Sequence, residues 1–95
     1  KIEAVMEAVK DKEFPDLPRF GIRMFLNKKM DEITYFGMGP QESYRDKHQA
    51  SWHGLFRSKV AQMHEDYIRP QENGSHYDCD YVELTIGQCG IAAVS

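Results

Sequence analysis

Features of membrane and nucleic-acid-binding proteins are scarce in this sequence of 95 residues. The longest uncharged apolar stretch, residues 90–94, is far shorter than the roughly 20 residues that a membrane-spanning helix needs. Basic residues are outnumbered, 12 against 15 acidic ones, and they are scattered along the chain instead of forming the clustered basic face of a nucleic-acid-binding domain. We therefore expect neither a membrane span nor a nucleic-acid partner.

Cysteine is rare as well, since Cys79 and Cys89 are the only two. A single pair in a chain without a secretory leader does not make the disulfide framework of a small secreted domain. We expect two reduced thiols in a cytoplasmic protein, with a Cys79–Cys89 bridge as the less favoured alternative. Because the sequence begins at Lys1 and not at Met, we also expect it to be a piece of a longer protein.

The composition is otherwise that of a soluble globular domain, with 41% hydrophobic and 28% charged residues. No repeat, low-complexity tract or linker divides the chain, so we treat residues 1–95 as one domain. A chain of this size buries only about 60% of the surface that it exposes when unfolded. Its core is therefore expected to be small.

Four segments have the sequence character of β-strands. Residues 20–26 and 81–86 alternate with a period of two, residues 33–36 are β-branched and aromatic, and residues 91–94 form a last short apolar run. Turn formers separate these segments, above all the dipeptide Asn73-Gly74. The predicted fold is all-β and mainly antiparallel.

Two regions do not follow this pattern. In residues 1–10 the apolar side chains recur at helical spacing, which favours a helix over the alternative of a strand. Residues 43–67 lack strand alternation, so we expect a long irregular insert with a short helix at 59–64 that Ser58 caps. The apolar residues at helical spacing in this insert are Trp52, Leu55, Phe56, Val60 and Met63.

Metal ligands and nucleophiles do not form a convincing set. His76 and Cys79 are spaced as one ligand pair, but a structural zinc site normally needs two such pairs. We therefore expect solvated loop histidines and no metal site. Asp78 and Asp80 flank Cys79 and should raise the pKa of its thiol, which opposes a reactive thiolate.

Two carboxylates, Glu42 and Glu72, could in principle form the acid and base pair of a glycosidase. Such catalysis needs two carboxyl groups on opposite sides of a sugar, inside a pocket that raises the pKa of one of them. A small β domain has little material to build that pocket. We expect both side chains to accept hydrogen bonds from loop backbone, and we predict no catalytic residue.

Aromatic residues near loops supply the only residue-based argument for ligand binding. Tyr44 and Trp52 could stack on a sugar ring while Gln41 bonds to its hydroxyls, although an aromatic residue in a small β domain more often serves packing. These three residues are the candidates for sugar binding. A stand-alone carbohydrate-binding module and a pure interaction domain that uses exposed strand edges are the two alternative functions.

Three segments form an ordered set of motifs: residues 17–24 (LPRFGIRM), 35–47 (YFGMGPQESYRDK) and 67–74 (YIRPQENG). Together they resemble the small-chain domain, the C-terminal β domain of the large glycoside hydrolase family 2 β-galactosidases, over essentially the whole chain. The resemblance implies structural roles for a set of turn residues, namely Gly37, Gly39, Pro40, Glu42, Tyr44, Asp46, Pro70, Glu72, Asn73 and Gly74.

The resemblance also implies a function. It points to an accessory, structural portion of a cytoplasmic enzyme that hydrolyses terminal β-galactosides such as lactose with retention, as a homo-oligomer that uses Mg²⁺ and often Na⁺. The fold would be part of a β-sandwich or supersandwich of the galactose-mutarotase type. Residues 1–9 would then be a strand, against their helical spacing.

Several functional residues of the family have no counterpart in this sequence. The catalytic glutamates of the family lie in a (β/α)8 barrel domain that is not part of this chain, so the rest of the enzyme is the implied partner. The sugar-facing Trp of the domain lies downstream, so Trp52 does not inherit its role, and Asp80-Tyr81 stand where the family commonly has Arg-Trp. We expect no catalytic residue, metal ligand or cofactor in this chain, which is predicted to be inactive alone.

Overall fold

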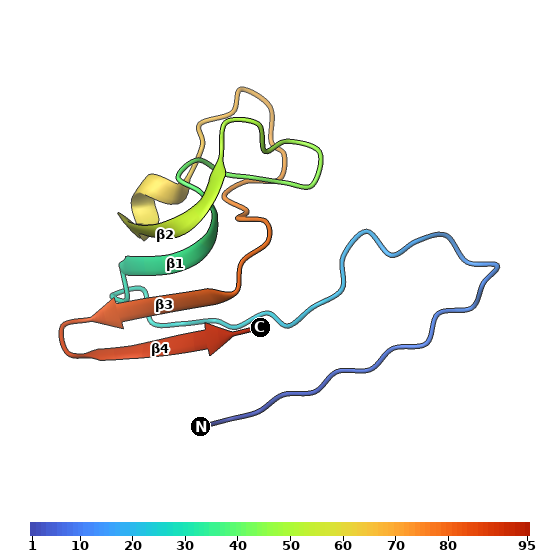
Figure 1. Ribbon diagram of the computed structural model, residues 1–95, viewed down its shortest axis with the longest axis horizontal. Coiled ribbons are helices and arrows are strands. Elements are labelled where there is room, and N and C mark those ends of the chain that lie inside the picture. The colour runs from blue at the N-terminus through green and yellow to red at the C-terminus, as the bar shows by residue number, and fades with distance from the viewer.

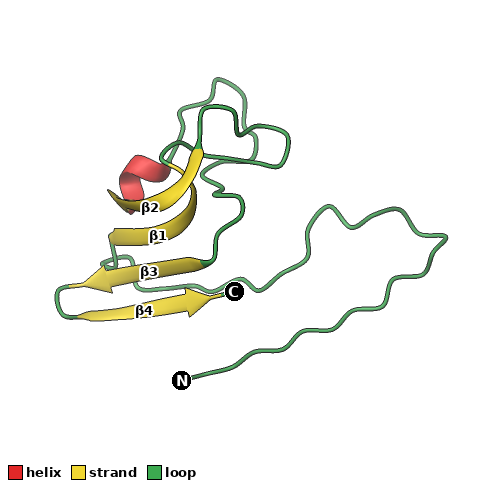
Figure 2. Ribbon diagram, in the orientation of Figure 1, coloured by secondary structure: helices red, strands yellow, loops and turns green.

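Four antiparallel strands form a single sheet in the computed structural model, which describes all residues from 1 to 95 (Figure 1). The strands are β1 (Glu32–Gly39), β2 (Trp52–Lys59), β3 (Tyr81–Ile86) and β4 (Cys89–Val94), and their order across the sheet is β2-β1-β3-β4. The only helix is the single 3-10 turn η1 (Val60–Met63) (Figure 2). The prediction of an all-β, mainly antiparallel fold is confirmed.

The strands predicted at 33–36, 81–86 and 91–94 correspond to β1, β3 and β4. β1 lies in the interior of the sheet, where Thr34 is opposite Arg57 of β2 on one side and Glu83 of β3 on the other. It ends at Gly39 because Pro40 has no N–H to donate to a ladder. A tight turn joins β3 to β4, and Gly87 adopts there a φ of +57°, which glycine reaches without steric cost.

The two faces of the sheet differ in chemistry. Residues directly opposite each other in antiparallel strands point to the same side, so the register assigns every strand residue to a face. One side, which we call the apolar face, carries no charged strand residue; its larger members are Ile33, Tyr35, Trp52, Phe56, Val82, Leu84, Ile86, Cys89, Ile91 and Ala93. The other side, the mixed face, combines Phe36 and Leu55 with Glu32, Arg57, Lys59 and Glu83.

Strand β2 corrects the prediction of a helix-bearing insert. Helical spacing of apolar residues from Trp52 onward was the basis of that prediction, but residues 52–59 pair with β1 along eight residue pairs. Hydrogen bonding to the exposed edge of β1 outweighs the local periodicity, because strand preference depends on what lies beside the strand. The helix expected at 59–64 is reduced to η1, and its N-cap is Lys59, not Ser58.

Residues 1–31 contain no strand or helix and form a long arm that leaves the sheet (blue to cyan in Figure 1). The helix favoured for residues 1–10 and the strand expected at 20–26 are therefore both absent, as is the strand that the resemblance implied for residues 1–9. Alternation alone does not make a strand, because the backbone hydrogen bonds of a strand need a neighbouring chain. No neighbour pairs with these segments in the structure.

The core is small and lies where the loops cover one end of the apolar face. Tyr35 is the only large hydrophobic residue that is buried, with 2% of its surface exposed. Its ring contacts those of Phe56 and His76, at centroid distances of 5.4 and 4.3 Å. No helix of the chain has the length and apolar character that crossing a membrane requires.

Candidate functional site: the Glu42 clasp

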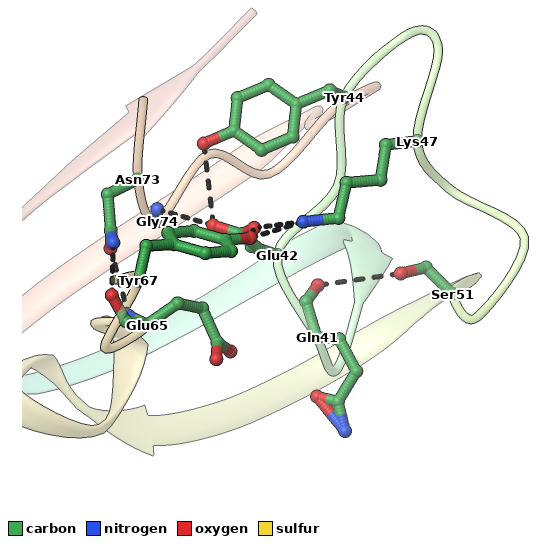
Figure 3. Close-up of polar contacts among 9 residues, drawn as sticks. All are labelled: Gln41, Glu42, Tyr44, Lys47, Ser51, Glu65, Tyr67, Asn73 and Gly74. Atoms are coloured by element: carbon green, nitrogen blue, oxygen red, sulfur yellow. Dashed lines mark hydrogen bonds and ion pairs between the residues drawn. The ribbon is translucent and has the colours of Figure 1, made fainter. Parts of the chain in front are cut away.

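Two loops that are distant in sequence meet beyond the end of β1. The first loop, residues 40–51, connects β1 to β2, and the second, residues 64–80, connects η1 to β3. Their contact is organised by one carboxylate, Glu42, whose side chain is only 4% exposed. We call Glu42 and the four residues that contact its carboxylate, Tyr44, Lys47, Tyr67 and Gly74, the Glu42 clasp (Figure 3).

Both carboxylate oxygens of Glu42 accept hydrogen bonds. Lys47 Nζ lies 2.6 Å from Oε1, which also accepts the hydroxyl of Tyr67. The backbone N–H of Gly74 donates to Oε2 at 3.0 Å, and the Tyr44 hydroxyl lies 3.4 Å from the same atom. Since Tyr67 and Gly74 belong to the second loop, this one side chain connects both loops.

The charge of Glu42 is stabilised by these donors. Burial acts to raise the pKa of its carboxyl, but the hydrogen bonds from Lys47, Gly74 and Tyr44 outweigh burial and hold that pKa below its ordinary value. The same contact raises the pKa of the Lys47 ammonium. Glu42 and Lys47 therefore form a charged pair at neutral pH.

Ser43 makes a second connection between the two loops. It is fully buried, and its hydroxyl donates to the carbonyl of Met38 and accepts the N–H of Tyr77, at 3.1 and 2.9 Å. Its own N–H donates to the carbonyl of Ser75 at 2.7 Å. Neighbouring residues in the chain, Glu42 and Ser43, thus hold the second loop at adjacent points.

The second loop is shaped by the Asn73-Gly74 turn that the sequence predicts. Asn73 Oδ1 accepts the N–H of Glu65 at 3.0 Å, and its Nδ2 donates to the carbonyl of the same residue. Gly74 has a φ of +68°, and a Cβ at this position would lie 2.8 Å from the carbonyl oxygen of Met63. The turn therefore needs glycine both for its backbone conformation and for space.

Sequence reasoning missed two members of the clasp. Lys47 and Tyr67 had no assigned role, although Lys47 closes the second motif and Tyr67 opens the third. Tyr67 lies 25 residues from Glu42 in the sequence, and no local pattern indicates that the two side chains are in contact. Glu42, Asn73 and Gly74, for which the resemblance implied structural roles, make the contacts described above, and those roles stay a prediction.

The comparison with known proteins decides the family. Residues 1–94 match the family described as the β-galactosidase small chain. The chain belongs to this family. It is 46% identical to a β-galactosidase of Actinobacillus pleuropneumoniae over 83 residues, which cover 87% of this chain and 8% of that protein. It is also 41% identical to a β-galactosidase of Staphylococcus xylosus over 78 residues, and 33% identical to one of Vibrio cholerae over 87 residues, again about 8% of each relative.

The chain spans only about 8% of the length of these relatives. Its residues correspond to a small-chain domain, and the relatives that contain such a domain are named as β-galactosidases. The membership agrees with the resemblance inferred from the three motifs. It does not favour the alternative of a stand-alone carbohydrate-binding module.

Within the small-chain domain, the three sugar-binding candidates do not converge on one site. Tyr44 contacts Glu42, whereas the backbone carbonyl of Gln41 faces Ser51 on the other side of the loop (Figure 3). Trp52 lies on β2 with its ring edge against Phe56, at a centroid distance of 5.6 Å. Gln41 and Tyr44 line different hollows of the surface, and Trp52 lines neither of them.

The remaining predicted turn residues surround the clasp without belonging to it. Glu72 pairs with the guanidinium of Arg19 on the surface. Asp46 and Pro70 are exposed and make no side-chain hydrogen bond. Gly37 and Gly39 lie in β1, where neighbouring atoms leave no room for a side chain. A Cβ on Gly37 would be 2.9 Å from the Cα of Cys79, and one on Gly39 would be 2.9 Å from the Phe56 ring.

Acid–base catalysis does not fit the clasp. Glu42 and Glu72 do line one shallow hollow, as a catalytic pair would have to. A general acid, however, needs a raised pKa, and that of Glu42 is lowered by its donors. Both oxygens of Glu42 are also committed to the two loops, so they are not available to a substrate.

Metal binding and thiol chemistry find no support either. No three His, Cys, Asp or Glu side chains lie close enough together to hold a metal ion. His76 Nδ1 faces the carbonyl of Met38, and the Cys79 thiol faces the carbonyl of Tyr81 at 3.2 Å. Both cysteines are free, and burial, with a smaller contribution from Asp80, raises the pKa of the Cys79 thiol.

Proposed function

We propose that this chain is an accessory, non-catalytic portion of a β-galactosidase that hydrolyses terminal β-D-galactosides such as lactose with retention. The catalytic carboxylates would lie in a barrel domain elsewhere in the parent enzyme, which is the partner of this chain. Membership in the small-chain family supports the parent activity. The observation that carries the non-catalytic role is the complete use of the buried Glu42 carboxylate to connect two loops.

The wider setting of the enzyme is part of the same proposal. By the resemblance of its motifs, the parent would be a cytoplasmic homo-oligomer of carbohydrate metabolism that uses Mg²⁺ and often Na⁺. We propose, from the resemblance alone, that these ions bind other parts of the enzyme.

A chimeric enzyme tests the proposal. This chain would replace the matching segment of the β-galactosidase of Actinobacillus pleuropneumoniae, to which it is 46% identical. The matched control is the same enzyme with that segment deleted, and the isolated chain is assayed beside them. We expect the chimera to hydrolyse a chromogenic β-galactoside and both the deletion and the isolated chain to be inactive. Turnover by the isolated chain, or full activity of the deletion, would contradict an accessory role.

A further inference from the structure

The mixed face of the sheet carries an apolar row that crosses all four strands. In the register of the sheet, Leu55 of β2 and Tyr81 of β3 both lie opposite Phe36 of β1. Val94 of β4 continues the row beside Tyr81. Leu55 and Val94 are 61% and 78% exposed, and Phe36 is 39% exposed. The solvent side of an antiparallel sheet is usually polar, so a continuous apolar row on this side indicates a surface that makes a contact.

Two unpaired charges lie beside this row, one on each side of β1. Arg57 of β2 and Glu83 of β3 are both opposite Thr34 of β1, and they border a shallow hollow of about 500 Å³ above it. Neither forms an ion pair with the other or with a third group. The next row along the strands is neutralised within the chain, since Lys59 Nζ lies 2.7 Å from the Glu32 carboxylate. One basic and one acidic group are therefore left over, in equivalent places on either side of β1.

A two-fold axis that runs parallel to β1, just above the mixed face, would bring these groups together. Such an axis places β1 over β1 of a second copy and β2 over its β3. Arg57 of each copy then faces Glu83 of the other, which gives two intermolecular ion pairs. In the row beside them, Leu55 faces Tyr81 of the second copy, and Phe36 faces its own equivalent on the axis. The contact combines an apolar centre with paired charges, as specific protein interfaces do.

The pairing of charges decides which occupant fits this surface. Arg57 and Glu83 are in contact with water while the face is open, and covering either of them without a partner would be costly. In the symmetric arrangement each is covered together with an opposite charge, which offsets the loss of hydration. A different domain would have to present both charges at the same spacing, whereas a second copy supplies them by symmetry.

Resting on the proposed function, we propose that the mixed face is a subunit contact of the parent enzyme, in which two copies of this chain meet about a two-fold axis. Homo-oligomerisation of the parent does not by itself specify a surface. The order of charged and apolar residues on β1, β2 and β3 does specify one, because it is complementary to itself in this orientation. The residues that carry the contact are Phe36, Leu55, Arg57, Tyr81 and Glu83.

Charge reversal tests this contact in the full-length chimeric enzyme. Arg57→Glu and Glu83→Arg are made singly and together, and association is measured by analytical ultracentrifugation over a range of concentrations. In a symmetric pair of copies, each single variant places like charges opposite each other at both contacts. We therefore expect each to associate at least about tenfold more weakly than the unchanged chimera. The matched controls, Arg69→Glu and Asp66→Arg, reverse exposed charges on the second loop and should associate like the unchanged chimera.

A mixture of the two single variants gives the deciding result. In a mixed pair of copies, opposite charges again face each other at both contacts, so the mixture and the double variant should both associate like the unchanged chimera. Recovery in the double variant but not in the mixture would place the ion pair within one chain and overturn the proposal. Normal association of the single variants, or a monomeric chimera, would overturn it as well.

Hydrolysis of a chromogenic β-galactoside is assayed separately on the same samples. An inactive chimera that still shows this association pattern would reject the proposed function and support the contact. An active chimera without the pattern would do the reverse, so the two failures are distinguishable.

Discussion

Replacing Glu42 by glutamine tests the clasp with little change of side-chain volume. Glutamine keeps one acceptor oxygen but places an NH₂ group where a carboxylate oxygen now accepts two donors. Because the side chain is only 4% exposed, water cannot replace the lost acceptor. If the NH₂ group replaces Oε1, the Tyr67 hydroxyl loses its acceptor. If it replaces Oε2, the Gly74 N–H loses its acceptor. We expect a loss of about 2 kcal/mol in the local stability of the two loops.

Amide hydrogen exchange in the full-length chimeric enzyme measures this loss. A change of about 2 kcal/mol in local opening corresponds to roughly 30-fold faster exchange, because each 1.36 kcal/mol is a factor of ten. The acceleration should appear in peptides that cover residues 40–50 and 64–77 and should be absent from β3 and β4. Glu72→Gln is the matched control, since Glu72 only forms a surface ion pair with Arg19 and should change exchange less than threefold. Equal acceleration by both substitutions would refute the special role of Glu42.

Three further predictions follow from individual contacts. Gly74→Ala should destabilise the protein by at least about 1 kcal/mol more than Gly87→Ala does. Both glycines have positive φ, but only at Gly74 would a Cβ lie against a carbonyl oxygen. Thermal melting of the two variants measures the difference. Ser43→Ala should cost about 1 kcal/mol, since it removes the acceptor of the Tyr77 N–H and one of the two side-chain groups that face the Met38 carbonyl, and unchanged melting would contradict this. The pKa of Glu42 is lower in the folded chain than its ordinary value of 4.5, so its contribution to stability is complete above about pH 4.5 and is lost as the pH falls through the lower folded value. The stability difference between the wild type and Glu42→Gln should accordingly shrink in acid, and a difference that grows there would show the opposite sign.

The candidate site was only partly predictable from the sequence. The motif residues Glu42, Asn73 and Gly74 indicated structured turns, and the structure places all three in the contact between the two loops. Lys47 and Tyr67 could not be added to them, because their positions depend on how the loops at the end of β1 approach each other. The convergence of Gln41, Tyr44 and Trp52 on one sugar could not be judged from spacing either, and the structure separates them.

Local sequence determined those parts of this protein in which the pattern and the neighbours agree. Alternation or β-branched residues in β1, β3 and β4, and glycines at the two turns with positive φ, were sufficient to predict these elements. Tertiary structure decided the rest. Residues 52–59 form β2 in spite of their helical spacing because they hydrogen-bond to the edge of β1. The 20–26 segment forms no strand in spite of its alternation because no strand lies beside it to accept its backbone hydrogen bonds. The physical reason is the same in both cases: a helix satisfies its backbone hydrogen bonds within one segment, whereas a strand needs a second chain segment beside it.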